Sequence, residues 1–441
     1  MKGIHLSLKE KIFYPFGQIG ISLLNQALVL GILFYYSPPK GEGTVFVPVA
    51  LAGLAITIGR FLDAIIDPLI AYLSDKTQSR FGRRIPYIAI GAPLLVIVFF
   101  FLWLPPSKYF NVGHFTNFIY LAVFTTLFWI LFSVFTIPYT SLLPEIATTT
   151  KERIDLSTFV AVAMVVGMFI GGLGYNFLVK KSFIVMAIVL GIIAFICFCP
   201  VVLTIRERVK VSSEYSQIKI IPALLTTLKN KPYLIYLYSR FSFEFGWNLL
   251  AAGMSFMVVV IMGMAKENAG IIIIIPMVSA LLSFPVINII SKKFGKKAIF
   301  NLTMLSISIL LSSIFFIGKI ELPISLKFQA YILMILMGPP FAGFLVLPNA
   351  IIADIIDYDE KLTGLRREGV YYGVQAFVIK VGVSLATFVA GLIMGYFGKN
   401  VGHDLGIRLL GPTAAFFIFI ALIVFQFYPL EEKRETTAEP R

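Results

Sequence analysis

The sequence predicts an all-α polytopic membrane protein with about twelve transmembrane helices, on three observations. Hydrophobic residues make up 58% of its 441 residues and charged residues only 14%, whereas a soluble protein carries about a quarter charged residues. Apolar runs of about eighteen residues or more recur from end to end, each long enough to cross a bilayer as a helix. Basic residues gather between these runs, so the net charge of +14 is typical of cytoplasmic loops and does not predict nucleic-acid binding.

Six spans are expected on each side of a polar, basic stretch at residues 205–231. The expected spans are 12–36, 46–74, 86–104, 115–143, 157–179, 183–204, 232–263, 270–290, 298–318, 328–356, 369–397 and 407–428. This predicts an N-terminal six-helix bundle at 1–204 and a C-terminal one at 232–428. The middle loop and the tail at 429–441 are expected in the cytoplasm.

The loops on one side of the membrane carry most of the lysines and arginines, including Lys76, Arg80, Arg83 and Arg84 after the second span. The positive-inside rule therefore puts both termini in the cytoplasm of a multi-pass protein of the plasma (inner) membrane.

Two loops at corresponding positions of the two halves share a motif. The loop after the second span reads Phe81-Gly82-Arg83-Arg84, and the loop after the eighth reads Phe294-Gly295-Lys296-Lys297. This weak repeat indicates two pseudo-symmetric six-helix bundles, the parallel repeat of major facilitator transporters.

Few ionisable residues fall well inside the expected spans. They are Asp63, Asp67, Glu244, Arg60, Arg240 and Lys380. Such groups are costly in the membrane and indicate function by default. Equal numbers of acids and bases are expected if buried charges pair.

The second span carries the strongest signal. Arg60, Asp63 and Asp67 are spaced i, i+3, i+7 and so share one helix face. Measured from the cytoplasmic end of the span, Asp63 lies at a depth of about 18 Å and Asp67 at about 12 Å. Both carboxylates are thus near the midplane, where secondary transporters bind substrate and coupling ions.

Pro68 adds to this signal, because a proline inside a helix frees the carbonyl one turn earlier, here that of Ala64. A free carbonyl beside two carboxylates suits a hard cation or a proton. The alternative is a structural salt bridge from Arg60 to Asp63, with Lys380 pairing Asp67.

The seventh span carries Arg240 and Glu244 at i, i+4. This pair either neutralises itself or faces the cavity, where it gates the pathway or touches substrate.

The chain resembles the glycoside–pentoside–hexuronide:cation symporters, the melibiose-permease-like branch of the major facilitator superfamily, over nearly its whole length. The matching blocks are Arg60-x-x-Asp63-Ala64-x-x-Asp67-Pro68 with Ser74-Asp75…Arg80-Phe81-Gly82-Arg83-Arg84, then Ile137-Pro138-Tyr139…Pro144, then Ala353-Asp354-Ile355-Ile356-Asp357-Tyr358…Gly364…Arg367-Glu368-Gly369 with Gln375 and Lys380.

The resemblance implies two bundles that rock around a central site. It implies that Asp63 and Asp67 bind Na⁺, Li⁺ or H⁺, with Ser133 as the hydroxyl ligand and Lys380 close by. It further implies that Gln375 lies near a sugar. For the cytoplasmic gate it implies a pairing of Asp354 or Asp357 with Arg366 or Arg367.

The chain departs from the family where melibiose-type permeases bind sugar. Ser22 and Thr136 stand at the positions of two sugar-binding aspartates, and Thr140 at that of a tryptophan. Carboxylates accept strongly from sugar hydroxyls, so the cation machinery is expected to carry over and the galactoside specificity is not. Another sugar, a glycoside, an acidic sugar held by Arg240 or Lys380, or a non-sugar solute all remain open.

Polar and aromatic residues of the spans are candidates to line the cavity. Beyond Ser22, Thr136, Thr140, Arg240, Glu244 and Gln375, they are Asn25, Gln26, Trp129, Tyr139, Trp247, Asn248, Tyr371 and Tyr372.

The leading hypothesis is a cation-coupled symporter of a sugar or glycoside, expected to be a monomer in the lipid bilayer and to bind no nucleic acid. A carrier of a lipid-like or other non-sugar solute is the alternative. A membrane-embedded enzyme is disfavoured, because no catalytic constellation of nucleophile and base occurs at membrane depth. No cofactor is expected beyond the coupling ion, and no metal beyond a Na⁺ at Asp63 and Asp67.

Overall fold

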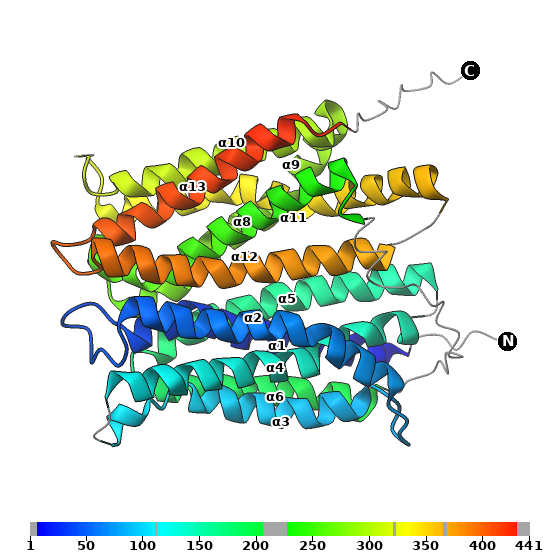
Figure 1. The fold of residues 1–441 in the computed structure, drawn as a ribbon, viewed down its shortest axis with the longest axis horizontal. Coiled ribbons are helices and arrows are strands. Elements are labelled where there is room, and N and C mark those ends of the chain that lie inside the picture. Colours follow the sequence, from blue (N-terminus) through cyan, green and yellow to red (C-terminus); the bar gives the residue numbers. More distant parts are fainter. Residues whose placement is uncertain are drawn as a thin grey trace. The chain divides into compact units, whose positions relative to one another are not determined.

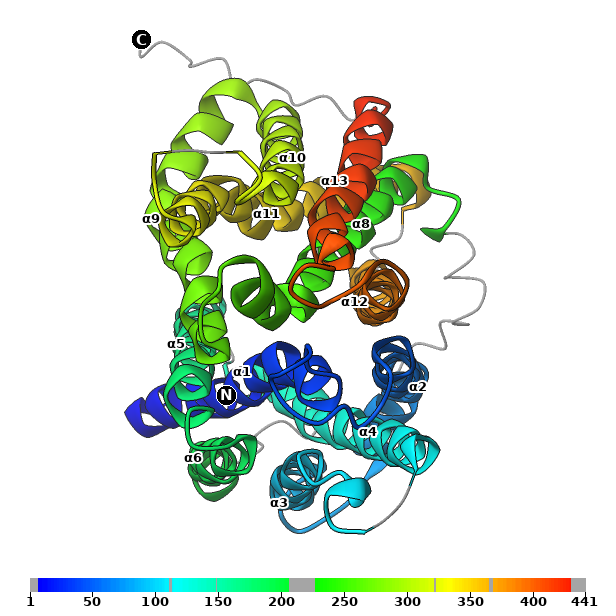
Figure 2. The same cartoon turned by 90° about the vertical axis from the view of Figure 1, so that its left-hand side faces the viewer.

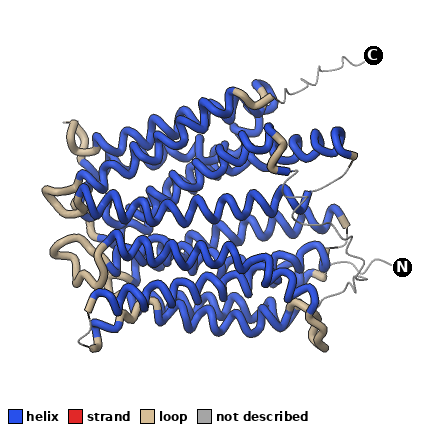
Figure 3. The backbone as a smooth tube through the Cα atoms, in the orientation of Figure 1, coloured by secondary structure: helices blue, strands red, loops and turns tan. Residues whose placement is uncertain are grey.

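The computed structural model describes residues 7–110, 113–147, 149–205, 227–320, 323–364 and 368–429. In this part of the chain every long element is a helix, and no strand occurs (Figures 1 and 3). The long helices are α1 Leu8–Tyr36, α2 Val49–Lys76, α3 Ile85–Phe101, α4 His114–Ile146, α5 Thr150–Leu178, α6 Phe183–Thr204, α8 Lys231–Phe256, α9 Ala269–Phe294, α10 Lys296–Ser313, α11 Leu326–Thr363, α12 Glu368–Phe397 and α13 Leu405–Gln426. The short elements are 3-10 turns at Pro106–Lys108, Lys266–Asn268 and Ile314–Phe316, and a π-helical turn at Met257–Ile261.

Each expected span coincides with one of these helices over most of its length. Eleven described helices are long and apolar enough to cross a membrane, and α3 is a shorter apolar helix of 17 residues. The prediction of an all-α polytopic membrane protein is confirmed.

Helices α5 and α11 run furthest past the ends that hydropathy predicts. Helix α5 begins at Thr150 rather than near residue 157, because Thr149 and Glu152 form a reciprocal capping box that starts it in a polar segment. Helix α11 continues to Thr363 rather than residue 356 and ends at Gly364, whose φ of 68° is a left-handed cap. Hydropathy detects the apolar core of a span, whereas capping sets the ends of the helix.

The chain divides into two compact units. Unit 1 comprises the described parts of Met1–Glu214, Ala251–Ile274 and Thr387–Ile407, and unit 2 those of Tyr215–Leu250, Ile275–Ala386 and Arg408–Arg441. The division into six-helix bundles at 1–204 and 232–428 stays a prediction.

In unit 1, α1 packs on α5 and α6, α2 packs on α4, and α3 lies beside both α4 and α6 (Figure 2). Glycines make the closest approaches. A Cβ on Gly171 would lie 2.7 Å from the Leu23 carbonyl oxygen, and one on Gly59 would lie 2.8 Å from the Thr125 carbonyl carbon. Without these side chains α1 meets α5, and α2 meets α4, almost backbone to backbone.

In unit 2, α8 packs on α11 and on the first part of α12. Phe243 on α8 stacks on Phe344 of α11 with ring centroids 3.5 Å apart. The Tyr236 hydroxyl donates to Gln375 Oε1 of α12 at 2.8 Å. A built-on Cβ at Gly343 of α11 would meet Thr303 Oγ1 of α10 at 2.4 Å, so these two helices are also in close contact.

The two matched loop motifs have the same backbone feature. Gly82 has a φ of 101° and Gly295 a φ of 91°, a region that favours glycine. In both cases at least one of the two basic residues that follow pairs with an acid on a later helix. Arg83 and Arg84 contact Glu145 of α4, and Lys296 contacts Asp354 of α11. The motif is therefore a glycine turn that holds a basic pair, and its recurrence supports the repeat.

Candidate functional site

The candidate cation site is built on α2 and α4 of unit 1. The Ser133 hydroxyl of α4 donates to Asp63 Oδ1 of α2 at 2.5 Å. Both residues are buried, with exposed fractions of 2% and 3%. The close approach at Gly59 brings α4 near enough for this bond, since Gly59 lies one turn before Asp63. The predicted carboxylate and hydroxyl are thus in direct contact.

Arg60 lies one turn before Asp63 on the same face of α2. Its guanidinium carbon lies 3.8 Å from the centroid of the buried Trp129 ring, and its Nη2 lies 3.5 Å from Asn25 Oδ1 of α1. Trp129 is itself one turn before Ser133 on α4. Helix α4 therefore presents an aromatic ring to the Arg60 guanidinium and a hydroxyl to the Asp63 carboxylate. The ring and the amide thus hold the Arg60 guanidinium on the face of α2 that also carries Asp63.

Asp67 follows one turn after Asp63 and is half-buried. Pro68 lies inside the continuous helix α2 and has no N–H to donate to the Ala64 carbonyl. Two carboxylates, a hydroxyl and a carbonyl are the oxygen ligands that a hard cation prefers, and a carboxylate also accepts a proton. No cluster of three or more His, Cys, Asp or Glu side chains occurs in the described residues.

The substrate candidates in unit 1 have different environments. Ser22 is buried and accepts from the Gln18 amide at 3.1 Å. The Thr136 hydroxyl is buried without a hydrogen-bond partner. Thr140 is exposed and donates to the Thr136 carbonyl at 3.0 Å. Tyr139 is fully buried, stacks on Tyr14, and donates to its carbonyl at 2.9 Å, so its ring and hydroxyl join α4 to α1.

The candidates in unit 2 gather on α8 and α12. Arg240 Nη2 contacts Glu244 Oε1 at 2.8 Å. The Asn248 amide donates to the Glu244 carbonyl at 2.9 Å, and the Trp247 ring lies 4.3 Å from that of Phe341. Gln375 is bonded to Tyr236, and the Tyr372 side chain is 45% exposed. A polar stripe thus crosses the middle of α8.

Two parts of the predicted site stay predictions. Lys380 is half-buried on α12 in unit 2, whereas Asp63 and Asp67 belong to unit 1. In the expected cytoplasmic gate, Arg366 and Arg367 lie outside the described residues. Asp357 is exposed, and Asp354 contacts Lys296 Nζ at 2.7 Å.

The sequence interpretation missed two clusters in unit 1. Arg83 and Arg84 converge on the buried Glu145, with Arg84 Nη2 at 3.1 Å from its Oε1. In the loop after α12, Lys399 Nζ donates to the Ser37 and Pro38 carbonyls and to Ser37 Oγ. The adjacent basic residues Arg83 and Arg84 were the signal in the sequence that could have revealed the first cluster. No local pattern signals the second.

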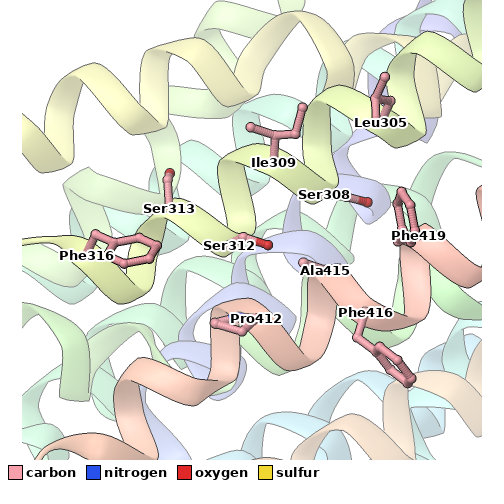
Figure 4. Close-up of a pocket in the computed structure, with 10 residues that line it drawn as sticks. All are labelled: Leu305, Ser308, Ile309, Ser312, Ser313, Phe316, Pro412, Ala415, Phe416 and Phe419. Atoms are coloured by element: carbon pink, nitrogen blue, oxygen red, sulfur yellow. The ribbon is translucent and has the colours of Figure 1, made fainter.

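An apolar groove of about 570 Å³ lies between α10 and α13 of unit 2 (Figure 4). Its lining is Leu305, Ser308, Ile309, Ser312, Ser313, Phe316, Pro412, Ala415, Phe416 and Phe419. None of the predicted site residues belongs to it.

Comparison with known proteins identifies the family of the chain. Residues 13–432 match the model of the family described as "MFS/sugar transport protein". The chain belongs to this family. The resemblance to the cation symporters of the major facilitator superfamily is thereby confirmed, and the chain is a polytopic membrane transporter of a family that is not enzymatic.

The relatives of this chain include carriers of different solutes. It is 25% identical to the glucuronide carrier protein homolog of Escherichia coli, covering 97% of this chain and 94% of the relative. It is 23% identical to the sodium-dependent lysophosphatidylcholine symporter 1-B of Danio rerio, covering 87% and 81%. The solved D-xylose-proton symporter has a TM-score of 0.68 at 15% identity, over 93% of this chain and 97% of that one, which shows the shared fold.

Proposed function

We propose that this transporter couples the uphill uptake of a sugar or glycoside to the downhill entry of a cation, Na⁺ or H⁺, by alternating access. The observation that carries the proposal is the buried hydrogen bond between Ser133 and Asp63, one turn from both Arg60 and Asp67. A lone buried carboxylate is costly in a membrane, and this one is surrounded by a hydroxyl donor and a cation held on an aromatic ring. A carboxylate so prepared can exchange a bound cation or proton with the solution.

In this proposal Asp63 and Asp67 bind the cation, and Ser133 supplies a neutral oxygen ligand. Arg60 compensates the negative charge of the carboxylates when no cation is bound. The protein works as a monomer in the inner membrane, with both termini in the cytoplasm. The sodium-dependent symporter relative supports coupling, and the family description supports a sugar.

Uptake into proteoliposomes tests the proposal. Radiolabelled D-xylose, methyl β-D-glucoside and methyl β-D-glucuronide are offered with an inward Na⁺ gradient, an inward proton gradient, or neither. We expect at least one sugar to accumulate above its external concentration with a gradient, and Asp67→Asn to abolish accumulation while the protein stays inserted. Accumulation in that variant would overturn the cation site.

A carrier of a lipid-like solute is the second candidate, favoured by the apolar groove between α10 and α13 and by the lysophosphatidylcholine symporter relative. The same vesicles offered a radiolabelled lysophospholipid distinguish the two. Gradient-dependent uptake of the lipid without uptake of any sugar would replace the first proposal with this one.

A further inference from the structure

The groove between α10 and α13 is as deep as one leaflet of a bilayer. Along the α10 side its lining runs from Phe316, beside the end of the expected span at residue 318, to Leu305 (Figure 4). From residue 305 to residue 316 a helix rises about 16 Å, and half of the hydrocarbon core is about 15 Å thick. The groove therefore extends from the membrane surface to about the midplane, which is the depth that one acyl chain occupies.

The two helices are held together at the Phe316 end of the groove. A Cβ on Gly411 of α13 would lie 2.3 Å from the Leu311 carbonyl oxygen of α10, so the two backbones are in contact there. One turn earlier on α13, Arg408 Nη1 donates to the Phe315 carbonyl at 3.1 Å and to the Ile317 carbonyl at 2.6 Å. These contacts fix the turn after α10 against α13, so a ligand meets walls that are already formed.

The walls of the groove are apolar and open. Leu305 and Ile309 on one side, and Phe416 and Phe419 on the other, are all exposed. On a protein that spans a membrane, acyl chains cover such a surface. An apolar wall does not distinguish one lipid from another, so any selectivity must come from the polar end of the groove.

A lysine stands at that end. Ile317 has φ −56° and ψ 120°, Gly318 has φ 72°, and the Lys319 N–H donates to the Phe316 carbonyl at 2.9 Å. These features define a type II turn, which requires a residue such as glycine at its third position. The Lys319 ammonium lies 4.1 Å from the centroid of the Phe315 ring, whose centroid is 5.4 Å from that of Phe316. The turn thus holds an exposed cation just beyond the end of the span, at the level of lipid phosphates.

We propose that this groove binds one anionic phospholipid of the bilayer, with an acyl chain along the apolar walls and the phosphate at Lys319. The lipid stays bound, and its site belongs to unit 2, whereas the candidate cation site belongs to unit 1. The site requires only that the protein spans the membrane, so it does not depend on which solute is carried. A second copy of the chain fits less well, because two-fold packing on this face would bring two Lys319 ammonium groups to the same level.

Native mass spectrometry of the purified full-length protein tests the proposal, because it identifies bound lipids by mass. The probes are palmitoyl-oleoyl phosphatidylglycerol and palmitoyl-oleoyl phosphatidylcholine, which share their acyl chains and differ in net charge, and the single-chain lysophosphatidylcholine. We expect one phosphatidylglycerol to bind about fivefold more tightly than phosphatidylcholine, the factor that one basic residue contributes at an anionic lipid surface. Glycerol 3-phosphate should not compete, because it has no acyl chain.

Two variants separate the polar end of the site from the apolar walls. Lys319→Gln should remove the preference for phosphatidylglycerol and leave phosphatidylcholine binding unchanged. Ser312→Phe should weaken the binding of both lipids, because Ser312 is half-buried in the groove (Figure 4) and a ring there would fill it. The matched controls are Lys327→Gln, which removes an exposed lysine at the start of α11, and Ser306→Phe, at a half-buried position of α10 outside the groove lining. Neither control should change either affinity.

Equal affinities for the two phospholipids would overturn the proposal, as would an equal loss of preference in Lys319→Gln and Lys327→Gln. Unchanged binding in Ser312→Phe would also overturn it. Tighter binding of the lysophospholipid would assign the groove to a lipid-like solute, and a dimer that dissociates in Ser312→Phe would assign it to a second copy. The unfolding temperature in detergent separates a lost site from a lost fold. Phosphatidylglycerol should raise it in the wild type and in Ser306→Phe, and not in Ser312→Phe.

Discussion

Ser133 and Asp63 share a hydrogen bond of 2.5 Å between two helices, at a point where both side chains are almost fully buried. The hydroxyl donates to the carboxylate, and in the proposed transport cycle its lone pairs turn toward a bound cation. The bond gives a buried carboxylate a polar partner, which offsets part of the cost of its burial.

Ser133→Ala should lower the affinity for the coupling cation without abolishing uptake. Because the variant removes a neutral oxygen ligand of the cation, we expect the cation concentration at half-maximal uptake to rise at least about tenfold, which corresponds to about 1.4 kcal/mol. Thr126→Val is the control, because it removes a hydroxyl from α4 that donates to the Ala122 carbonyl. An unchanged cation dependence in Ser133→Ala would contradict the role given to Ser133.

The stacking of Arg60 on Trp129 gives a second prediction. Trp129→Phe keeps an aromatic face under the guanidinium, and Trp129→Leu removes it. Because a desolvated cation–π contact contributes about 2 kcal/mol, Leu should lower the unfolding temperature and the cation affinity more than Phe does. Equal effects of the two substitutions would assign Trp129 to packing alone.

The sequence predicted best what one helix determines by itself. Arg60, Asp63 and Asp67 share a face because their spacing matches the helical repeat, and the structure keeps all three on α2. Asp63 with Ser133 required the family resemblance, since they are 70 positions apart. Trp129 was predicted only as a candidate to line the cavity, and its contact with Arg60 was not predicted. That contact depends on the register between α2 and α4, which is set by glycine contacts that no local pattern reveals.

Contacts made by loops were the least predictable. Hydropathy treats residues 37–45 and 398–406 as polar connections, yet Lys399 bonds to Ser37 across 362 positions. Glu145 was missed for a different reason. It ends an apolar span, and the only cytoplasmic pairing that the resemblance implied involved Asp354 or Asp357 with Arg366 or Arg367.

The two acid–base contacts of the repeated loops should differ in their contribution to stability. Glu145 and Arg84 are nearly buried, with side chains 7% and 8% exposed, so Glu145→Gln removes a buried carboxylate from the guanidinium groups that it contacts. We expect a loss of about 3 kcal/mol or more in the free energy of unfolding. Lys296 and Asp354 are 33% and 43% exposed, and Asp354→Asn should cost less than about 1 kcal/mol.

Thermal unfolding in one detergent measures both variants. The matched positions of the two pairs make each the control for the other. Equal destabilisation would mean that burial does not decide the contribution of these contacts.

Lys399 gives a prediction on pH. The Lys399 ammonium lies in the loop between α12 and α13 and contacts three oxygens of Ser37 and Pro38. Burial lowers its pKa from 10.5 to about 8. Between those values the unfolded chain binds more protons than the folded protein, so this residue makes folding more favourable as pH rises from about 8 to 10.5. Below about pH 8 its contribution is constant, because both states carry the proton.

The difference in unfolding temperature between the wild type and Lys399→Gln, measured from pH 7 to pH 10, isolates this residue. It should move in favour of the wild type as pH rises above about 8, with a limiting slope of about 1.4 kcal/mol per pH unit in the free energy of unfolding. Lys40→Gln removes an exposed lysine from the α1–α2 loop, where its backbone N–H donates to Asn400, and serves as the charge-matched control. A difference that stays flat across this range, or that falls with pH, would show that Lys399 is not held as a desolvated ammonium in the loop.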